Sequence, residues 1–237
     1  MKRLQTKTAR LITEAFERLD YEKLGAIYCD EGGDAFWNDR REPCRTLGIA
    51  LAEILLNRLK PGGRSLYVGA GVAELPILLM EALDLGRTFD AFNLRAGEVE
   101  VLNQACKGLP FRISGNDARS ARGTFDHLCI VSVLNDPEQY PEISALSYGR
   151  ANPVTFNSTA FVDQRTNVLA LADACLRKLA LPALVSTSVE EIPWITEWCE
   201  RNTIDYVVEE EDYHTAIVED PVCFITLGRG TTSMKRH

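Results

Sequence analysis

The sequence predicts an α/β protein: a doubly wound, mostly parallel sheet of seven strands, with an antiparallel C-terminal hairpin and a helical N-terminal extension. Short apolar runs alternate with stretches that can form helices, which is typical of parallel strands joined by crossover helices. The last two runs are joined by the acidic residues 209–221, too short a stretch for a crossover helix with its loops, so these strands should form a hairpin. The expected strands are 65–68, 89–92, 111–114, 127–134, 184–187, 206–209 and 223–227.

Length and composition limit the class of protein. A chain of 237 residues, 46% hydrophobic and 25% charged, suits a soluble globular protein of one large domain with a smaller appendage. The net charge of -8 argues against non-specific nucleic-acid binding, which depends on neutralising phosphates. No apolar run approaches the roughly 18–20 residues of a membrane span. The N-terminus lacks the features of a signal peptide, and seven scattered cysteines without a C-x-x-C pair indicate a reduced, cytoplasmic protein without a metal site.

Apolar residues at helical spacing predict three amphipathic helices, within residues 8–19, 47–55 and 168–179. The first two precede the first expected strand. We therefore expect a helical N-terminal cap at residues 1–60, the sheet domain at 61–230 and a short tail at 231–237.

The connection between residues 135 and 163 is long and has no sustained periodicity. Structureless loops beyond about 12–15 residues are uncommon and often serve as lids or binding loops. A surface excursion that contains a short helix is the alternative interpretation.

The strongest local signal is the run SLYVGAGVAELP at residues 65–76. It predicts a strand, a Gly-x-Gly turn and then a helix that tolerates Pro76 in its first turn. The glycines would let the backbone approach a ligand closely above the strand ends, although a tight turn without a ligand is also possible. A dinucleotide fingerprint needs a small residue where this chain has Glu74, which would face the pyrophosphate. NAD is therefore disfavoured, whereas a phosphate-free ligand carrying adenosine and an amino acid is not.

In these features the chain resembles the class I S-adenosylmethionine-dependent methyltransferases, over about residues 60–230. The run VGAG at 68–71 is similar to the family's first motif, which lies against the methionine part of the cofactor. The run AFNLR at 91–95 ends the second strand, where the family normally holds the ribose with an acid. The run SGNDA at 114–118 resembles the third motif, in which Asp117 would accept the adenine amino group. The resemblance implies cofactor contacts from Val68, Gly69, Ala70, Gly71, Glu74, Asn93, Leu94, Asp117, Ala118, Ser132 and Val133.

The run FDHLCIVSVLNDP at 125–137 is similar to the fourth motif and should lie beside the transferring methyl group. Methyl transfer mainly requires correct placement of the acceptor. A base helps where the acceptor must lose a proton, and Asp136, Tyr140 and His214 are the candidates. For His214 the alternative is a solvent-facing histidine in the acidic hairpin, and His127 is expected to be structural.

Three residues depart from the family pattern: Tyr67 and Asn93 replace acids, and Ala73 replaces a frequent glycine. An amide at 93 gives up charge-assisted hydrogen bonds to the ribose, so Asn93→Asp is expected to tighten cofactor binding.

Two further features receive structural interpretations. Residues 209–212 should form a solvated acidic turn, and Trp194 and Trp198 should pack one helix face on the sheet.

The resulting hypothesis is an S-adenosylmethionine-dependent methyltransferase acting on a small molecule or peptide. The alternatives are a catalytically inactive binding or scaffolding protein, and an enzyme that transfers the aminopropyl or aminocarboxypropyl arm of the same cofactor. An NAD-dependent reductase ranks below these because of Glu74.

Overall fold

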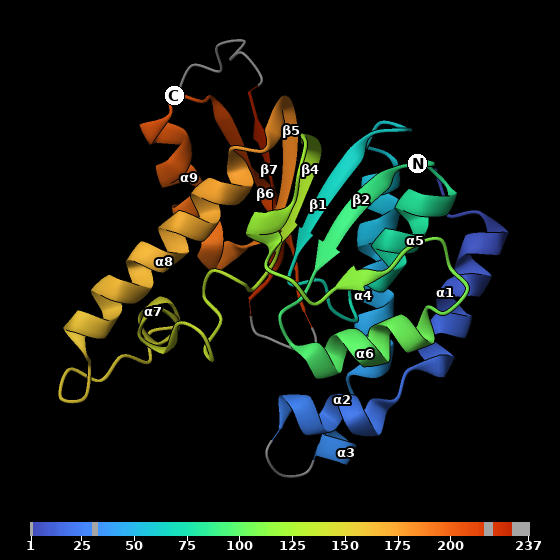
Figure 1. Ribbon diagram of the computed structural model, residues 1–237, viewed down its shortest axis with the longest axis horizontal. Helices are drawn as coiled ribbons and strands as arrows, with labels where there is room; N and C mark the ends of the chain where they lie inside the picture. Colours follow the sequence, from blue (N-terminus) through green and yellow to red (C-terminus); the bar gives the residue numbers. More distant parts are fainter. Residues whose placement is uncertain (1, 30–32, 216–219, 229–237) are drawn as a thin grey trace. The chain divides into compact units, whose positions relative to one another are not determined.

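The computed structural model describes residues 2–29, 33–215 and 220–228, so the expected tail at 231–237 lies outside the described residues (Figure 1). The strands follow the order β3-β2-β1-β4-β5-β7-β6. All described pairings are parallel except those that β7 makes with β5 and β6. This order, with helices between the parallel strands, confirms the predicted fold class. The chain divides into two compact units, residues up to Ala121 with 214–215, and residues 122–213 with the chain from Asp220.

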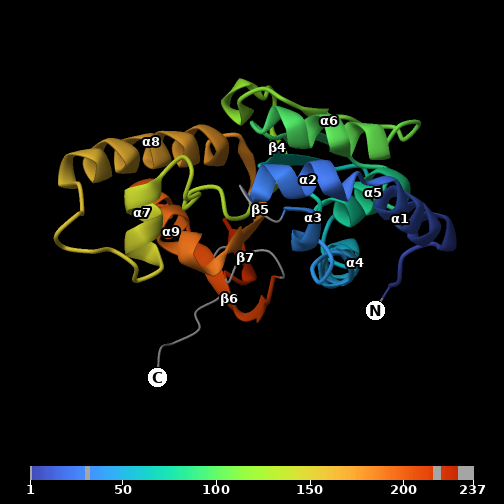
Figure 2. The ribbon, with the colours of Figure 1, turned by 90° about the horizontal axis from the view of Figure 1, so that it is seen from below.

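The first compact unit holds the helices that precede the sheet and the first three strands. Its helix α5 packs against both α1 and α4, while α2 lies against α6 (Figures 1 and 2). The elements are α1 (Thr6–Arg18), α2 (Tyr21–Tyr28), α3 (Gly33–Phe36), α4 (Arg41–Leu56), β1 (Arg64–Val68), α5 (Leu75–Leu83), β2 (Thr88–Phe92), α6 (Ala96–Ala105) and β3 (Ile113–Ser114).

Helix α4 approaches the beginning of α5 at Gly48. A Cβ atom added there would lie 2.5 Å from the carbonyl oxygen of Ala73 and 2.7 Å from Cγ of Pro76. Both are closer than any real Cβ contact, so only glycine allows this packing. Pro76 itself occupies the first turn of α5, as predicted, where its missing N–H leaves no helical hydrogen bond unmade.

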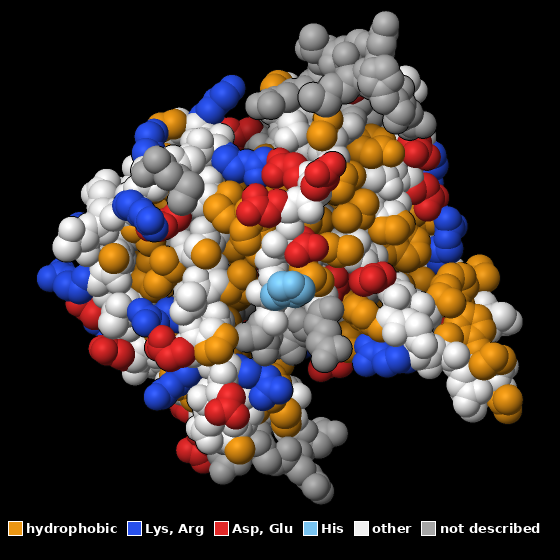
Figure 3. All heavy atoms as spheres, turned by 180° about the vertical axis from the view of Figure 1, so that it is seen from behind, with side chains coloured by type: hydrophobic (Ala, Val, Ile, Leu, Met, Phe, Trp, Pro, Cys, Tyr) orange, Lys and Arg blue, Asp and Glu red, His pale blue; other side chains and the backbone are white. Residues whose placement is uncertain are grey.

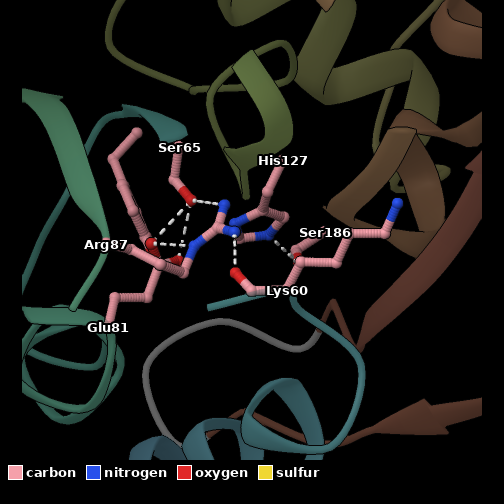
Figure 4. A network of polar contacts seen from close by, with 7 residues as sticks. Lys60, Ser65, Glu81, Arg87, His127 and Ser186 are labelled. Atoms are coloured by element: carbon pink, nitrogen blue, oxygen red, sulfur yellow. Dashed lines mark hydrogen bonds and ion pairs between the residues drawn. The ribbon is translucent and has the colours of Figure 1, made fainter. Parts of the chain in front are cut away.

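A buried polar network fills the space between β1 and α5 (Figure 4). Arg87 donates from Nε to Glu81 at 3.0 Å, from Nη2 to the Ser65 hydroxyl at 2.9 Å and from Nη1 to the Lys60 carbonyl at 2.7 Å. The Ser65 and Tyr67 hydroxyls also donate to Glu81, each at 2.6 Å. Tyr67, which departs from the family pattern, thus satisfies a buried carboxylate of the core.

The second compact unit holds the remaining strands. Helices α7, α8 and α9 pack side by side in it (Figure 2). His127 is buried, and its Nε2 lies 2.9 Å from Oγ of Ser186 on the neighbouring strand, a structural position. The elements are β4 (Phe125–Ile130), α7 (Pro141–Ser147), α8 (Ser158–Leu176), β5 (Leu179–Ser188), α9 (Ile192–Arg201), β6 (Tyr206–Tyr213) and β7 (Val222–Leu227).

Several predicted boundaries were wrong. The third strand is confined to Ile113–Ser114, and the fourth ends at Ile130 rather than at residue 134. Leu179 begins β5 instead of ending α8. Residues 209–212 belong to β6, which continues to Tyr213 past an irregularity in its pairing with β7, so they are not a turn.

The long connection between 135 and 163 contains the short helix α7 and the first turn of α8. The short helix expected in the alternative interpretation is therefore present, while a role as a lid or binding loop stays a prediction.

Three properties of the described residues bear on the protein class. No described helix has the length and apolar character required to cross a bilayer. No group of three or more His, Cys, Asp or Glu in the described part of the chain could hold a metal ion. On the face seen in Figure 3, acidic and basic side chains are interspersed with apolar ones.

Candidate functional site

The carboxyl ends of β1, β2 and β3 meet at one edge of the first unit, because the three strands are parallel and in register. Val68 pairs with Phe92, and Phe92 pairs with Ser114. The residues that follow these strands are connected as well. The Ala70 N–H donates to the Phe92 carbonyl at 2.9 Å, and the Asn93 N–H donates to the Ser114 carbonyl at 3.0 Å. Three of the predicted cofactor motifs are therefore brought together at this edge.

The glycine turn, residues 69–71, needs glycine at two positions for different reasons. Gly69 has a φ of 74°, in the left-handed region that favours glycine. Gly71 is crowded by carboxylates: a Cβ atom there would lie 3.1 Å from Oε1 of Glu98 and 3.4 Å from Oε2 of Glu74. Because Gly71 has no side chain, two acids lie directly against the backbone of the turn.

Glu74 follows the glycine turn, and its side chain folds back onto Gly71. Its Oε2 accepts the Gly71 N–H at 2.8 Å. Burial raises the pKa of Glu74 to about 7, opposed by the N–H donors of Gly71 and of Glu74 itself, and the charge of Glu98 raises it further. A diphosphate at this turn would face both acids, which agrees with the sequence-based expectation that NAD is disfavoured.

Asn93 is buried, and both hydrogens of its amide group are donated within the protein. Nδ2 donates to the Ala70 carbonyl and to Oε2 of Glu98, both at 3.0 Å, while Oδ1 accepts the Arg95 N–H at 2.8 Å. These contacts use both amide hydrogens, which a carboxylate would not possess. The surroundings of Asn93 are built for an amide, and it connects the glycine turn to Glu98.

Glu98 and Tyr28 belong to the site but were missed on the sequence. Glu98 lies in the first turn of α6 and is 1% exposed. Its Oε1 accepts the Tyr28 hydroxyl at 2.7 Å, and the Arg95 guanidinium lies 5.5 Å from the centre of the Tyr28 ring. Burial raises the pKa of Tyr28, and the charge of Glu98 adds to that effect. An acid just after the second strand could have been noticed, whereas nothing in the sequence connects it to a tyrosine seventy residues earlier.

The remaining predicted cofactor residues of this unit have varied surroundings. Asp117 accepts the Arg119 N–H at 2.8 Å and pairs with the Arg119 guanidinium, with Nε at 2.9 Å. The hydrogen bond from the Arg119 side chain lowers the pKa of Asp117. Ala118 is buried, and Leu94 is exposed. The acceptor expected for the adenine amino group is therefore already ion-paired.

In the second unit, the segment that follows β4 is held by one buried carboxylate. Glu191 accepts the N–H groups of Ser132 at 3.0 Å, Val133 at 2.6 Å and Leu134 at 2.5 Å. The Thr187 hydroxyl also donates to it, at 3.0 Å. Burial raises the pKa of Glu191, although hydrogen bonds from the Leu134 N–H, from Ser188 and from the Thr187 hydroxyl oppose the rise. Ser132, with a φ of 55°, is thereby kept in a left-handed conformation that is uncommon for a serine.

Two of the predicted catalytic residues follow in the same unit. The Oδ1 atom of Asp136 accepts the N–H groups of Glu138 at 2.8 Å and Gln139 at 3.1 Å, so this carboxylate caps a turn. Tyr140 is largely buried at the beginning of α7. Asn135, which was not singled out, accepts the indole N–H of Trp194 at 2.9 Å.

The third candidate base and the second tryptophan lie on different elements. His214 follows β6 and has an exposed side chain. Trp198 donates to Asp173 of α8 at 3.0 Å, so the two tryptophans contact the segment after β4 and a neighbouring helix, rather than only the sheet.

No protein-family model matches the sequence, and no curated protein matches it. Solved structures do resemble it. Magnesium protoporphyrin IX methyltransferase (ChlM) from Synechocystis PCC 6803, with bound SAM, has 13% identity and a TM-score of 0.54, covering 95% of this chain and 99% of that one. The N-methyltransferase NodS from Bradyrhizobium japonicum WM9, in complex with S-adenosyl-L-homocysteine, has 11% identity and a TM-score of 0.51, covering 92% and 100%. The fold is that of the class I S-adenosylmethionine-dependent methyltransferases.

Proposed function

We propose that the protein is an S-adenosylmethionine-dependent methyltransferase that acts on a small molecule or a peptide. The observation that carries the proposal is the glycine turn at the carboxyl end of β1, with Glu74 and Glu98 beside Gly71. S-Adenosylmethionine carries a sulfonium, an ammonium and two ribose hydroxyls, and carboxylates attract or accept from all of these groups. The fold neighbours support the same cofactor.

When bound, the cofactor supplies an electrophilic methyl group, and this chain's residues supply position. Gly71 would let the ligand approach the backbone, and Glu74 and Glu98 would orient its cationic and hydroxyl groups. In the second unit, Glu191 fixes the conformation of residues 132–134, which the family resemblance implies lie near the methyl group. The proposal includes a cytoplasmic protein with an N-terminal extension at residues 1–60 and a methyltransferase domain at 61–230.

Thermal melting with S-adenosylmethionine, S-adenosylhomocysteine and NAD tests this proposal. A ligand at 100 times its Kd adds about 2.7 kcal/mol. For a domain of about 150–250 residues this corresponds to a rise in Tm of roughly 5–10 °C. We expect this rise with both adenosyl ligands and none with NAD. A rise with NAD, or no rise with millimolar adenosyl ligands, contradicts the proposal.

Gly71→Val tests whether the glycine turn is the binding site. Its side chain would occupy the space beside Glu98 and Glu74, so the variant should lose the ligand-dependent rise in Tm. Normal ligand binding by Gly71→Val would mean that the ligand binds elsewhere.

A further inference from the structure

Three strongly exposed apolar side chains lie on α7, on α8 and on the loop between these helices. Leu146 is 53% exposed, Val154 92% and Val162 60%. The rings of Phe156 and Phe161, both partly exposed, lie beside them with 5.6 Å between their centres. Figure 3 shows apolar side chains gathered at this end of α8, at the lower right. We call residues 143–162 the apolar tip.

The apolar tip is almost without charge. Arg150 is the one charged side chain among its 20 residues, whereas a quarter of the whole chain is charged and the net charge is -8. The Arg150 guanidinium lies 4.9 Å from the centre of the Tyr148 ring. Anionic lipid head groups repel an acidic protein but attract arginine, and tyrosine favours the boundary between lipid and water. The tip therefore has the charge and the aromatic residue that suit such a boundary.

The backbone of the loop is hydrogen-bonded within the tip itself. Oδ1 of Asn152 accepts the N–H of Val154 at 3.0 Å, and the Asn152 carbonyl accepts the N–H of Phe156 at 2.8 Å. At the beginning of α8, Oδ1 of Asn157 accepts the N–H of Ala160 at 3.0 Å. Paired N–H groups cost less to remove from water than unpaired ones. The loop can therefore enter an apolar phase without exposing these donors to it.

The tip is held by the helices on either side of it. Oε1 of Gln164 on α8 accepts the N–H groups of Glu142 at 3.0 Å and Ile143 at 3.2 Å, at the beginning of α7. In Figures 1 and 2 the loop lies at the end of α8 that is remote from β5. A stable contact with a folded protein needs about 800 Å² on each partner, whereas a lipid surface adapts to a small projecting end. The tip therefore fits a lipid surface better than a protein partner.

We propose that the apolar tip binds the surface of an anionic lipid bilayer, with Val154, Leu146 and Val162 inserted below the head groups and Arg150 beside the lipid phosphates. The contact needs no helix that spans the bilayer. The inference goes beyond the proposed function and does not depend on the adenosyl ligand.

Flotation of the full chain with vesicles tests the proposal. The protein should float with vesicles of phosphatidylcholine and phosphatidylglycerol, and more weakly with phosphatidylcholine alone. Val154→Asp should lower the partition coefficient at least about tenfold, because it replaces an inserted apolar side chain with a charge. Val207→Asp is the matched control, since Val207 on β6 is 52% exposed and the change in charge is the same. It should bind like the unmodified protein.

Arg150→Gln tests the electrostatic part. Binding to vesicles that contain phosphatidylglycerol should fall about fivefold, while binding to phosphatidylcholine alone should stay the same. Arg177→Gln removes the same charge at the other end of α8, where Arg177 pairs with Asp173 at 2.7 Å. This control should bind like the unmodified protein.

The other outcomes overturn the proposal. Absence of binding to either kind of vesicle would do so, as would equal binding by Val154→Asp and Val207→Asp. A dimer in light scattering that Val154→Asp dissociates, without vesicle binding, would make the tip a contact between two copies of the chain. Equal losses for Arg150→Gln and Arg177→Gln would remove the role of Arg150. Thermal melting with S-adenosylhomocysteine is read separately, so failure of the proposed function is distinguished from failure of this one.

Discussion

The side chain of Glu74 folds back onto Gly71, and its Oε2 accepts the Gly71 N–H at 2.8 Å. In many nucleotide-binding turns, backbone N–H groups of this kind are directed at an anionic ligand. Here one is already satisfied by a carboxylate three residues later in the chain. The turn consequently presents negative charge where related folds present hydrogen-bond donors, which favours a cationic ligand over a phosphate.

Glu74 should give the protein a pH-dependent stability. Because burial raises its pKa from 4.5 to about 7, the folded state holds a proton that the unfolded state has released. The favourable contribution is complete below pH 4.5 and is lost as the pH rises to about 7. Glu74→Gln should remove this loss of folding stability. The loss is below ~1.4 kcal/mol per pKa unit because the Glu74 side chain is partly exposed. Urea denaturation between pH 4.5 and 8 measures it; parallel curves for both proteins would contradict the pKa shift.

Asn93→Asp should destabilise the protein rather than improve it, which reverses the expectation from the sequence. The new carboxylate would face the Ala70 carbonyl and the carboxylate of Glu98, where the amide now donates two hydrogen bonds. We expect a loss of about 1–3 kcal/mol at pH 8. The loss should shrink as the pH falls, since a protonated Asp can donate again. Denaturation at several pH values measures it, and a tighter affinity for S-adenosylhomocysteine would refute this account of the site.

Glu191→Gln should loosen the segment after β4. The amide offers one acceptor oxygen in place of two, and its NH2 group would face either the N–H of Ser132 or the N–H groups of Val133 and Leu134. The expected destabilisation is about 1–3 kcal/mol, together with faster hydrogen exchange of these three amides. Glu197→Gln, at a half-exposed ion pair with Arg165, is the control and should cost less than about 1 kcal/mol. Equal protection factors in both variants would show that Glu191 does not hold the segment.

Arg87→Met should be among the most destabilising substitutions in the first unit. It removes the guanidinium from the fully buried Glu81, at a cost of about 3–5 kcal/mol. Arg64→Met breaks a neighbouring ion pair with Asp90 that is partly exposed, and should cost about 1 kcal/mol or less. Guanidinium denaturation of the two variants provides the comparison. Similar losses would mean that burial does not set the strength of these pairs.

The strands and the antiparallel hairpin follow from the sequence because alternation of apolar runs and helical stretches is a local pattern, whereas the order of the strands in the sheet was not predicted. The errors in the boundaries also have local causes. Residues 209–212 read as a turn because four acids favour solvent, yet β6 is an edge strand, where charged side chains are tolerated. Helices α2 and α3 were not located individually within the expected helical cap because they have only eight and four residues, too few to establish a period.

The candidate site was less predictable than the fold. The glycine turn and Asn93 lie at strand ends, so the resemblance to a family identifies them. The contacts of Asn93 with Glu98, and of Glu98 with Tyr28, depend on how α6 and α2 pack. Such tertiary contacts decide whether an amide or a carboxylate suits position 93, and a single sequence does not contain that information.

Gly48 limits how independently the N-terminal helices can be exchanged between proteins. Because α4 contacts the backbone of Ala73 and the ring of Pro76 at a distance that only glycine allows, α4 forms part of the support beneath the glycine turn. Helix α4 and the glycine turn are therefore packed together as one structural unit. If these helices were grafted onto another protein of this fold, α4 would keep its position only where the recipient allowed the same close contact between Gly48 and a backbone carbonyl. Exchange of N-terminal helices between proteins of this fold is therefore restricted by the need for a glycine at the contact with α5.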